Sequence, residues 1–290
     1  MNYAMENKIW RVGGPLFAYF GIRILVETLF YVVIMFTQVK NLDVSAAFSG
    51  LDFIDRYAHL VMEYTTLMSL VTMVISIPVF YKLMKKDYDY PVTLRKREHV
   101  FMLDKYFKSI NYKELILPLA LGIVATVGVS RIILMLPFDN IIGSYSQIKE
   151  GYQVGSIWMQ FLTLGILAPV TEELLFRGLV YKRLKTYYDW ITAAYISGII
   201  FGVAHLNLVQ GIYGFIMGIV FSFIYEKYKN IVAPIIMHMA ANIVVVLSIV
   251  NPISQIIDER WYLRIPVGIG FSVLFAIILI KIYKTKKAYE

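Results

Sequence analysis

The stretch from Ala168 to Tyr181 places three ionisable side chains, Glu172, Glu173 and Arg177, inside an otherwise apolar run. An ionised side chain near the centre of a bilayer costs roughly 2.5–3.5 kcal/mol on insertion scales. On a helix, Glu173 and Arg177 lie one above the other and can pair, whereas Glu172 is turned about 100° away. A buried ion pair that only fixes helix packing would leave Glu172 without a partner, which favours a functional site.

Two later apolar runs also carry polar side chains. His205 ends the run from Phe201 with Asn207 nearby, and His238 lies four positions before Asn242 on one helical face. A single histidine in a membrane is often only an interhelical hydrogen bond, but three such runs favour a shared site. At 1.5 Å per residue, Glu172, His238 and His205 lie roughly 15, 13 and 22 Å from the cytoplasmic boundary, so they can meet near the membrane middle.

These residue types suit hydrolysis without a covalent nucleophile. A desolvated carboxylate beside a histidine can accept a proton from water, and an amide or an imidazole N–H can donate to an oxyanion. Other designs of intramembrane protease fit poorly. The chain has no His-Glu-x-x-His helix and no aspartate in the middle of an apolar run, and Tyr195 replaces the first glycine expected before Ser197. Two histidines and a carboxylate could still ligate zinc, so zinc at Glu172, His205 and His238 stays open.

The composition indicates an integral membrane protein. Hydrophobic residues make up 59% and charged residues 17% of the chain, whereas soluble domains carry about 25% charged residues. The net charge of +8 does not indicate nucleic-acid binding, because the basic residues form short clusters between apolar runs. The absence of cysteine excludes disulfides, thiol nucleophiles, Fe–S clusters and cysteine-ligated zinc.

We expect an all-α integral membrane protein of about eight transmembrane helices, with an active-site cavity within the helix bundle. A spanning helix needs about 20 apolar residues. Such spans are predicted at 15–37, 59–84, 114–136, 156–181, 190–209, 211–225, 231–250 and 265–283. Residues 85–113 are too basic to span and are predicted to lie partly as an interfacial helix. Arg131, near the end of the third span, is expected to snorkel to the far interface.

The basic residues predict the orientation. Most basic residues outside the spans lie in alternate segments, namely the head, residues 85–113, 182–185 and 227–229, and the tail. The loops between these segments hold only Lys40, Arg56, Lys149, Arg260 and Arg264. By the positive-inside rule both termini are cytoplasmic. The chain divides into N-terminal membrane helices with a basic loop (1–155), a catalytic core (156–250), and a C-terminal helix with a basic tail (251–290).

The three polar stretches resemble the motifs of the CPBP (Abi) intramembrane proteases, the type II CAAX prenyl endopeptidase-like family. Its motifs Glu-Glu-x-x-x-Arg, Phe-x-x-x-His and His-x-x-x-Asn read here as 172–177, 201–205 and 238–242. All three are present in family order, each on a separate predicted helix, and the resemblance covers roughly residues 156–250. Any one motif is weak, but three together are specific.

The resemblance implies a role for each motif residue. Glu172 looks like the base that activates water, with His205 assisting it. His238 and Asn242 look like oxyanion stabilisers, and Glu173 and Arg177 look like the pair that orients the site. Family members have been described both as metalloproteases and as metal-independent glutamate proteases. We favour a site without a cofactor.

The absence of cysteine and the compact loops fit a bacterial plasma-membrane protein. Prenylated substrates are not expected for such a protein. The resemblance implies an endopeptidase for a membrane-associated peptide or protein, with a role in bacteriocin immunity or peptide maturation. Its partners are then this substrate and the lipid bilayer. The alternatives are a non-catalytic immunity or binding protein that retains the fold, and a proton-coupled transporter. A transporter would favour paired repeats, which the sequence lacks.

Overall fold

The computed structural model describes residues 3–40, 50–89, 112–133, 135 and 156–285. Over these residues the chain is helical and contains no strand, so the predicted all-α fold class is confirmed. The first half comprises α1 (Tyr3–Lys40), α2 (Gly50–Asp89), η3 (Tyr112–Leu115) and α4 (Ile116–Ile133). One long helix follows, made of α7 (Ile157–Gln160), η4 (Phe161–Leu167), α8 (Ala168–Glu173), η5 (Leu174–Tyr181) and α9 (Lys182–Leu184). The chain ends with α10 (Trp190–Val203), α11 (Leu208–Tyr228), α12 (Val232–Val250), α13 (Pro252–Glu259) and α14 (Trp261–Lys284).

Each of the eight predicted spans is helical in the described residues, but six or seven of them, rather than eight, qualify as membrane spans. Six helices are long and apolar enough to cross a bilayer, and a seventh candidate is the pair α12–α13, bent by 85°. The remaining apolar helix, α10, has 14 residues. Its length of about 21 Å falls short of a hydrocarbon core of about 30 Å.

Two further differences concern the segments between spans. The sequence predicts no helix between Asn251 and Ile265, yet α13 begins at Pro252, where Asn251 caps it by accepting a hydrogen bond from the Ile253 N–H at 2.9 Å. Proline suits the first turn of a helix because its missing N–H is not needed there. Of the predicted interfacial helix, residues 85–89 continue α2, and residues 90–111 lie outside the described residues.

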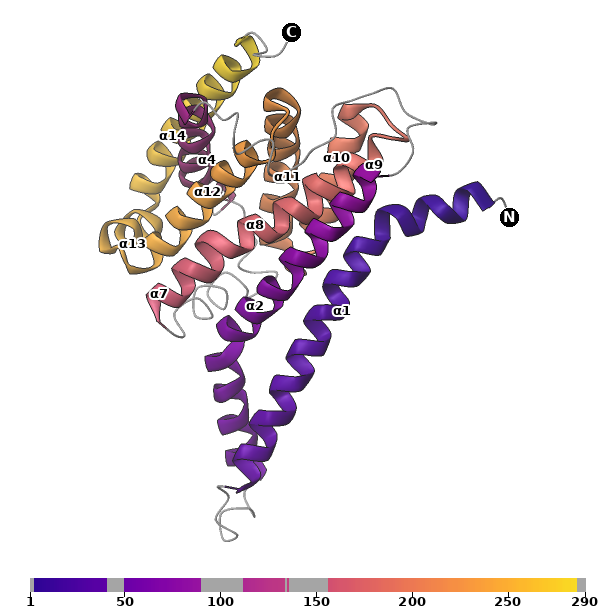
Figure 1. The fold of residues 1–290 in the computed structure, drawn as a ribbon. Coiled ribbons are helices and arrows are strands. Elements are labelled where there is room, and N and C mark those ends of the chain that lie inside the picture. Colours follow the sequence, from indigo (N-terminus) through magenta and orange to yellow (C-terminus); the bar gives the residue numbers. More distant parts are fainter. Residues whose placement is uncertain (1–2, 41–49, 90–111, 134, 136–155, 286–290) are drawn as a thin grey trace.

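The long helix α7–α9 lies in the interior of the bundle (Figure 1). Its buried side chains Leu175, Leu179 and Tyr181 belong to one hydrophobic cluster with Phe221 of α11 and Met237 of α12. The helices α1 and α14 lie on the outside, since only 11% of the most apolar window of each is buried. An apolar outer face of this kind suits contact with lipid, so the ionisable residues of α8 are shielded from the bilayer by protein.

Ion pairs join the helix ends that carry the basic residues. Arg183 of α9 donates to Asp87 of α2 at 2.7 Å, and Glu226 of α11 accepts from Tyr181 at 2.9 Å and from Lys185 at 2.8 Å. We call this part of the bundle the basic end. In Figure 1 it lies near the labels α9 and N, and α13 and the start of α7 lie at the other end.

Glycines allow α10 and α11 to pack closely as a hairpin. Each helix carries a Gly-x-x-x-Gly repeat, Gly198 with Gly202 in α10 and Gly214 with Gly218 in α11. Such repeats let the backbones of membrane helices approach each other. A Cβ at Gly202 would lie 2.5 Å from the carbonyl oxygen of Gly211, closer than packed side chains allow. This close packing fixes the position of the polar tip of the hairpin, which follows Gly202.

We predict that Gly202→Ala lowers the stability of the protein by about 1–3 kcal/mol, the usual cost of overpacking, because the hairpin must open to admit the methyl group. Gly270→Ala is the matched control, since nothing lies within 4 Å of a Cβ there. In a helix, replacing glycine with alanine otherwise stabilises by up to about 1 kcal/mol. Melting temperatures in detergent measure both, and equal values for the two variants would contradict the close packing.

Candidate active site

The helix that carries Glu172 and Glu173 is wider than an α-helix on both sides of them. The segments η4 and η5 are π-helical, with hydrogen bonds from residue i to i+5, and they flank the six-residue α8. Pro169 supplies a physical reason for η4, because its ring would clash with the carbonyl four positions earlier. Segments of π-helix are rare in proteins, and those that occur often lie at functional sites.

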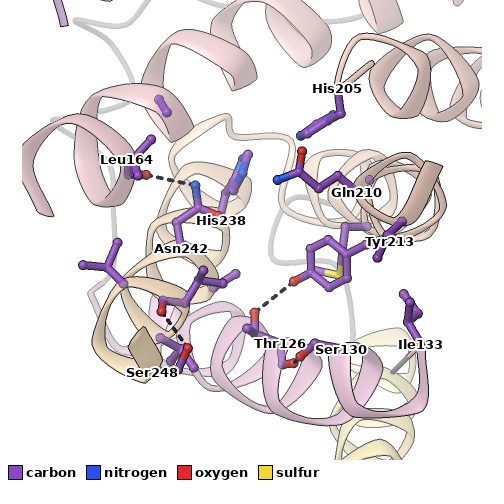
Figure 2. Close-up of a pocket in the computed structure, with 18 of the residues that line it drawn as sticks. Thr126, Ser130, Ile133, Leu164, His205, Gln210, Tyr213, His238, Asn242 and Ser248 are labelled. Atoms are coloured by element: carbon purple, nitrogen blue, oxygen red, sulfur yellow. Dashed lines mark hydrogen bonds between the residues drawn. The ribbon is translucent and has the colours of Figure 1, made fainter. Parts of the chain in front are cut away.

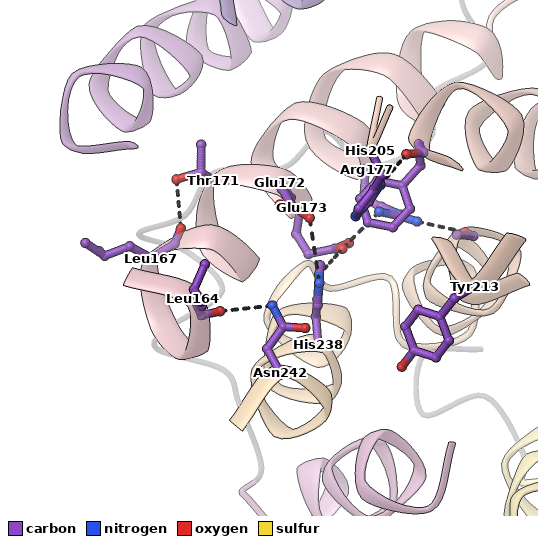
Figure 3. A network of polar contacts seen from close by, with 12 residues as sticks. Leu164, Leu167, Thr171, Glu172, Glu173, Arg177, His205, Tyr213, His238 and Asn242 are labelled. Atoms are coloured by element: carbon purple, nitrogen blue, oxygen red, sulfur yellow. Dashed lines mark hydrogen bonds and ion pairs between the residues drawn. The ribbon is translucent and has the colours of Figure 1, made fainter. Parts of the chain in front are cut away.

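The same proline explains how Asn242 is bound. The N–H groups of residues 168 and 169 are the helical donors that could reach the Leu164 carbonyl. The Ala168 N–H bonds to the Thr163 carbonyl instead, and Pro169 has no N–H, so neither donates to Leu164. Asn242 of α12 fills this position, donating from Nδ2 to the Leu164 oxygen at 2.9 Å (Figure 3). The amide is thereby held against the site helix, and its second N–H is available for another acceptor.

Arg177 is fully buried and bonded on two sides. Its Nη1 donates to Glu173 Oε1 at 2.9 Å, and its Nη2 donates to the carbonyl of Gly218 at 2.8 Å. The guanidinium carbon lies 4.8 Å from the ring centre of Phe201 and 5.0 Å from that of Phe221, which favours the cation further. The ion pair expected between Glu173 and Arg177 is therefore present, and Arg177 also binds the site helix to α10 and α11.

Glu173 binds His238 as well as Arg177. The Nδ1 atom of His238 lies 2.9 Å from Glu173 Oε1, and the imidazole stacks on Phe221 with ring centres 4.5 Å apart. Because a carboxylate paired with Arg177 is an acceptor, His238 must donate from Nδ1. This contact fixes the orientation of the imidazole and turns its Nε2 atom toward Glu172.

Glu172 has a different environment from Glu173. Its side chain is 22% exposed, whereas that of Glu173 is completely buried. Its Oε2 atom lies 3.7 Å from His238 Nε2. This distance exceeds that of a direct hydrogen bond. Glu172 thus combines contact with solvent and a nearby imidazole, two features that suit a general base.

His205 lies at the tip of the α10–α11 hairpin. Its Nδ1 atom is 2.8 Å from the Phe201 carbonyl oxygen, so Nδ1 carries the proton and Nε2 is left as an acceptor in the neutral ring. Leu206, with φ of 54°, then reverses the chain. Asn207 caps α11 by accepting from the N–H groups of Val209 and Gln210 at 3.0 and 3.2 Å. Asn207 therefore has a structural role at this turn.

A cavity of about 330 Å³ collects four of the six predicted site residues on its wall, namely Glu172, His205, His238 and Asn242 (Figure 2). Glu173 and Arg177 are not among the residues that line it. The structure therefore separates a group that a substrate could touch from a buried pair that orients it. A cavity of this size is within the range of sites for small ligands.

Several polar residues of the cavity wall are missing from the sequence prediction. Tyr213 of α11 and Thr126 of α4 share a hydrogen bond of 2.9 Å, and Gln210 extends its amide toward His205 in Figure 2. A polar residue in an apolar span is the signal that could have found Tyr213 and Gln210. Arg131, which the sequence places within reach of the far interface, is buried, lines the cavity, and pairs with Asp258 of α13 at 3.2 Å.

The donors of the zinc alternative were tested against the geometry. Among the described residues, no group of three or more His, Asp or Glu side chains is close enough together to hold a metal ion. The Nδ1 atom of His238 is bonded to Glu173 and that of His205 to a backbone carbonyl. Histidines that ligate metals are commonly held in this way and bind through Nε2, so zinc at Glu172, His205 and His238 stays an alternative.

Comparisons with known proteins agree with the three motifs. Residues 154–244 match the profile of the family described as type II CAAX prenyl endopeptidase Rce1-like. Among similar proteins, one from Bacillus subtilis (strain 168), named "Putative membrane peptidase YdiL", is 27% identical over 107 residues, which are 37% of this chain and 44% of that protein. The "Membrane-embedded CAAX protease MroQ" of Staphylococcus aureus (strain USA300) is 32% identical over 96 residues, 31% of this chain and 39% of that protein.

A third relative, "UPF0177 protein YaiF" of Lactococcus lactis, is 26% identical over 144 residues, 47% of this chain and 65% of that protein. The chain thus matches less than two thirds of the length of each of these relatives. No solved structure matches it. The predicted resemblance is confirmed: residues 154–244 match the Rce1-like type II CAAX prenyl endopeptidase family, and they lie within a multi-pass membrane protein.

We predict that Arg177→Ala destabilises the protein by about 3–5 kcal/mol, because it leaves Glu173 buried without its partner. The control is Arg260→Ala, which removes an exposed arginine whose hydrogen bond is to Tyr262 and should change stability by less than about 0.5 kcal/mol. The measurements are melting temperature in detergent and abundance in membranes. A melting temperature for Arg177→Ala equal to that of Arg260→Ala would show that Glu173 does not need this charge.

Proposed function

We propose that the protein is an intramembrane endopeptidase that hydrolyses a peptide bond of a membrane-associated peptide or protein. The observation that carries the proposal is the contrast between the two adjacent glutamates. Glu173 is fully buried and paired, whereas Glu172 is partly exposed in a cavity beside His238. A structural ion pair needs only a buried and paired carboxylate such as Glu173. A general base needs a carboxylate in contact with water, as Glu172 is.

Glu172 acts as the base in this proposal. It takes a proton from a water molecule in the cavity, and the resulting hydroxide attacks the carbonyl carbon of the substrate. His238, oriented by Glu173, shares a proton with Glu172 through Nε2, and Arg177 keeps Glu173 ionised. These three residues therefore position the base and keep its proton exchange aligned.

The remaining two residues of the wall act on the substrate. The second N–H of the Asn242 amide donates to the oxyanion that forms on attack, a contact that stabilises developing charge. His205, whose Nε2 is an acceptor in the neutral ring, receives the proton that Glu172 removed from the water and donates it to the departing amine. This proposal differs from the sequence hypothesis, in which His238 was an oxyanion donor and His205 assisted Glu172.

The relatives inform the class of substrate. One carries the name of a CAAX protease and another that of a membrane peptidase, which supports a peptide bond as the target. A role in bacteriocin immunity or in peptide maturation fits a substrate of this kind. We further propose that the basic end, with both termini, is cytoplasmic in a bacterial plasma membrane, because its lysines and arginines follow the positive-inside rule.

A non-catalytic immunity or binding protein is the second candidate. The observation that favours it is the dense network around Arg177, which would hold the same fold without any turnover. Such a protein would need Glu173 and Arg177 but would not need an ionised Glu172. The two candidates therefore differ in how they respond to loss of one carboxylate.

We predict that Glu172→Gln lowers turnover by at least about 10²-fold, the lower range for loss of a general base. The melting temperature should hardly change, because an amide keeps the shape of the side chain. Glu63→Gln, in an exposed part of α2, is the control for loss of a carboxylate elsewhere. The measurement is a comparison of new N-termini in the membrane proteome of cells that express each variant at equal abundance. Cleavage products that persist with folded Glu172→Gln would favour the binding protein.

A second prediction concerns metal. If Glu172 and the two histidines act without zinc, the purified protein should contain far less than one zinc per chain and should keep its activity in chelators. His205→Ala and His238→Ala should leave the zinc content unchanged. Stoichiometric zinc that is lost in either variant would show that the site is a metal centre.

A further inference from the structure

The cavity occupies one half of the bundle. Its wall includes residues between Thr126 and Ile133 at the end of α4, between Leu164 and Glu172 in the first half of the site helix, and between His238 and Ser248 in the later part of α12. Met73 of α2 and residues of the α10–α11 hairpin complete it. These are the parts of each helix farther from the basic end, because α4 starts and α12 starts next to basic turns. No residue of α9, at the basic end, lines the cavity.

The far end of the cavity is polar. Arg131 of α4 contacts Ser254 of α13 at 3.3 Å and Asp258 at 3.2 Å, and all three line the cavity with Ser130 and Gln255. The Asp258 side chain is 24% exposed. Paired charges and hydroxyl groups of this kind in a membrane protein face water or protein rather than lipid. In the described residues they form the polar end of the cavity, next to α13.

The basic end is closed by comparison. Above Glu172 toward that end, the site helix is buried continuously from Leu174 to Tyr181, and Arg183 and Leu184 are also buried. Water and substrate therefore have a polar path from α13 and a packed core on the other side.

We infer that the cavity opens on the face of the membrane opposite the basic end, and that water and an extended segment of the substrate enter there. With the basic end cytoplasmic, this face is extracytoplasmic. The partner is then a peptide being exported, or the extracytoplasmic flank of a membrane protein. This inference rests on the proposed function for the identity of the partner, and on the cavity alone for the side of entry.

The dimensions of the cavity restrict the form of the partner. A helix with its side chains is about 10–12 Å across, and a pocket of about 330 Å³ is at the lower end of sites for a drug-sized ligand. A few residues of extended chain fit such a space, and a folded helix does not. The peptide bond to be cut must also be free of helical hydrogen bonds for Asn242 to reach its oxygen.

The chain has no native cysteine, so single cysteines can map the path. Val245→Cys places a thiol on the cavity wall, and Leu247→Cys places one two residues away, on a side chain that is 51% exposed and does not line the cavity. Ser248→Cys is a second, nearly isosteric wall position. Tyr188→Cys, in the exposed turn after α9, reports the basic end.

The probe is a membrane-impermeant sulfonated maleimide, applied to right-side-out and to inside-out vesicles. A maleimide reacts with a thiolate in water, so Val245→Cys and Ser248→Cys should react at least about tenfold faster than Leu247→Cys, which faces lipid. They should react from the side opposite to that which labels Tyr188→Cys. Reaction from the same side as Tyr188→Cys, or no reaction of either wall cysteine from either side, would overturn the inference.

The labelling is independent of catalysis. In a Glu172→Gln background the wall cysteines should react as before, because the cavity does not need turnover. If they do, yet Glu172→Gln retains activity, the proposed function fails and the side of entry stands. If Glu172→Gln is inactive and the wall cysteines react from the basic end, the protease stands and the side of entry is wrong.

Discussion

The buried carboxylate of Glu173 is the group on which the rest of the structure depends. It lies where an ion without partners is very costly, and it is neutralised by Arg177 and oriented by His238. Because Arg177 also bonds the Gly218 carbonyl and His238 belongs to α12, one oxygen atom connects three helices. The packing of α11 and α12 against the site helix is therefore also the electrostatic support of Glu173.

The sequence predicts those contacts that lie within one helix. Glu173 and Arg177 are four positions apart, so their pairing follows from helical geometry alone. The apolar runs likewise predict the helices, because a span needs only length and hydrophobicity. The polar residues of the three motifs are recognisable as candidates for a site because charges in such runs are rare.

The sequence does not predict contacts between distant residues. His238 is 65 positions from Glu173, and Asn242 is 78 positions from Leu164, so nothing in their local spacing shows which atoms they touch. The roles that we propose for His238 and His205 differ from those in the sequence hypothesis for this reason. The partner of Arg131 was not predicted because Asp258 belongs to α13, a helix too short and too polar to register as a span. The length of α10 was overestimated because apolar residues continue past its last turn.

The π-helical segments on either side of α8 have a mechanical consequence. Turns with i to i+5 bonds are sites at which a helix bends, whereas the six residues of α8 between them are α-helical. A bilayer that thins or thickens makes spanning helices tilt or bend. In this helix, η4 and η5 provide the compliant joints, and the glutamates occupy the rigid link between them. Changes in membrane thickness would then be taken up on both sides of the site while the relative positions of its two carboxylates are preserved.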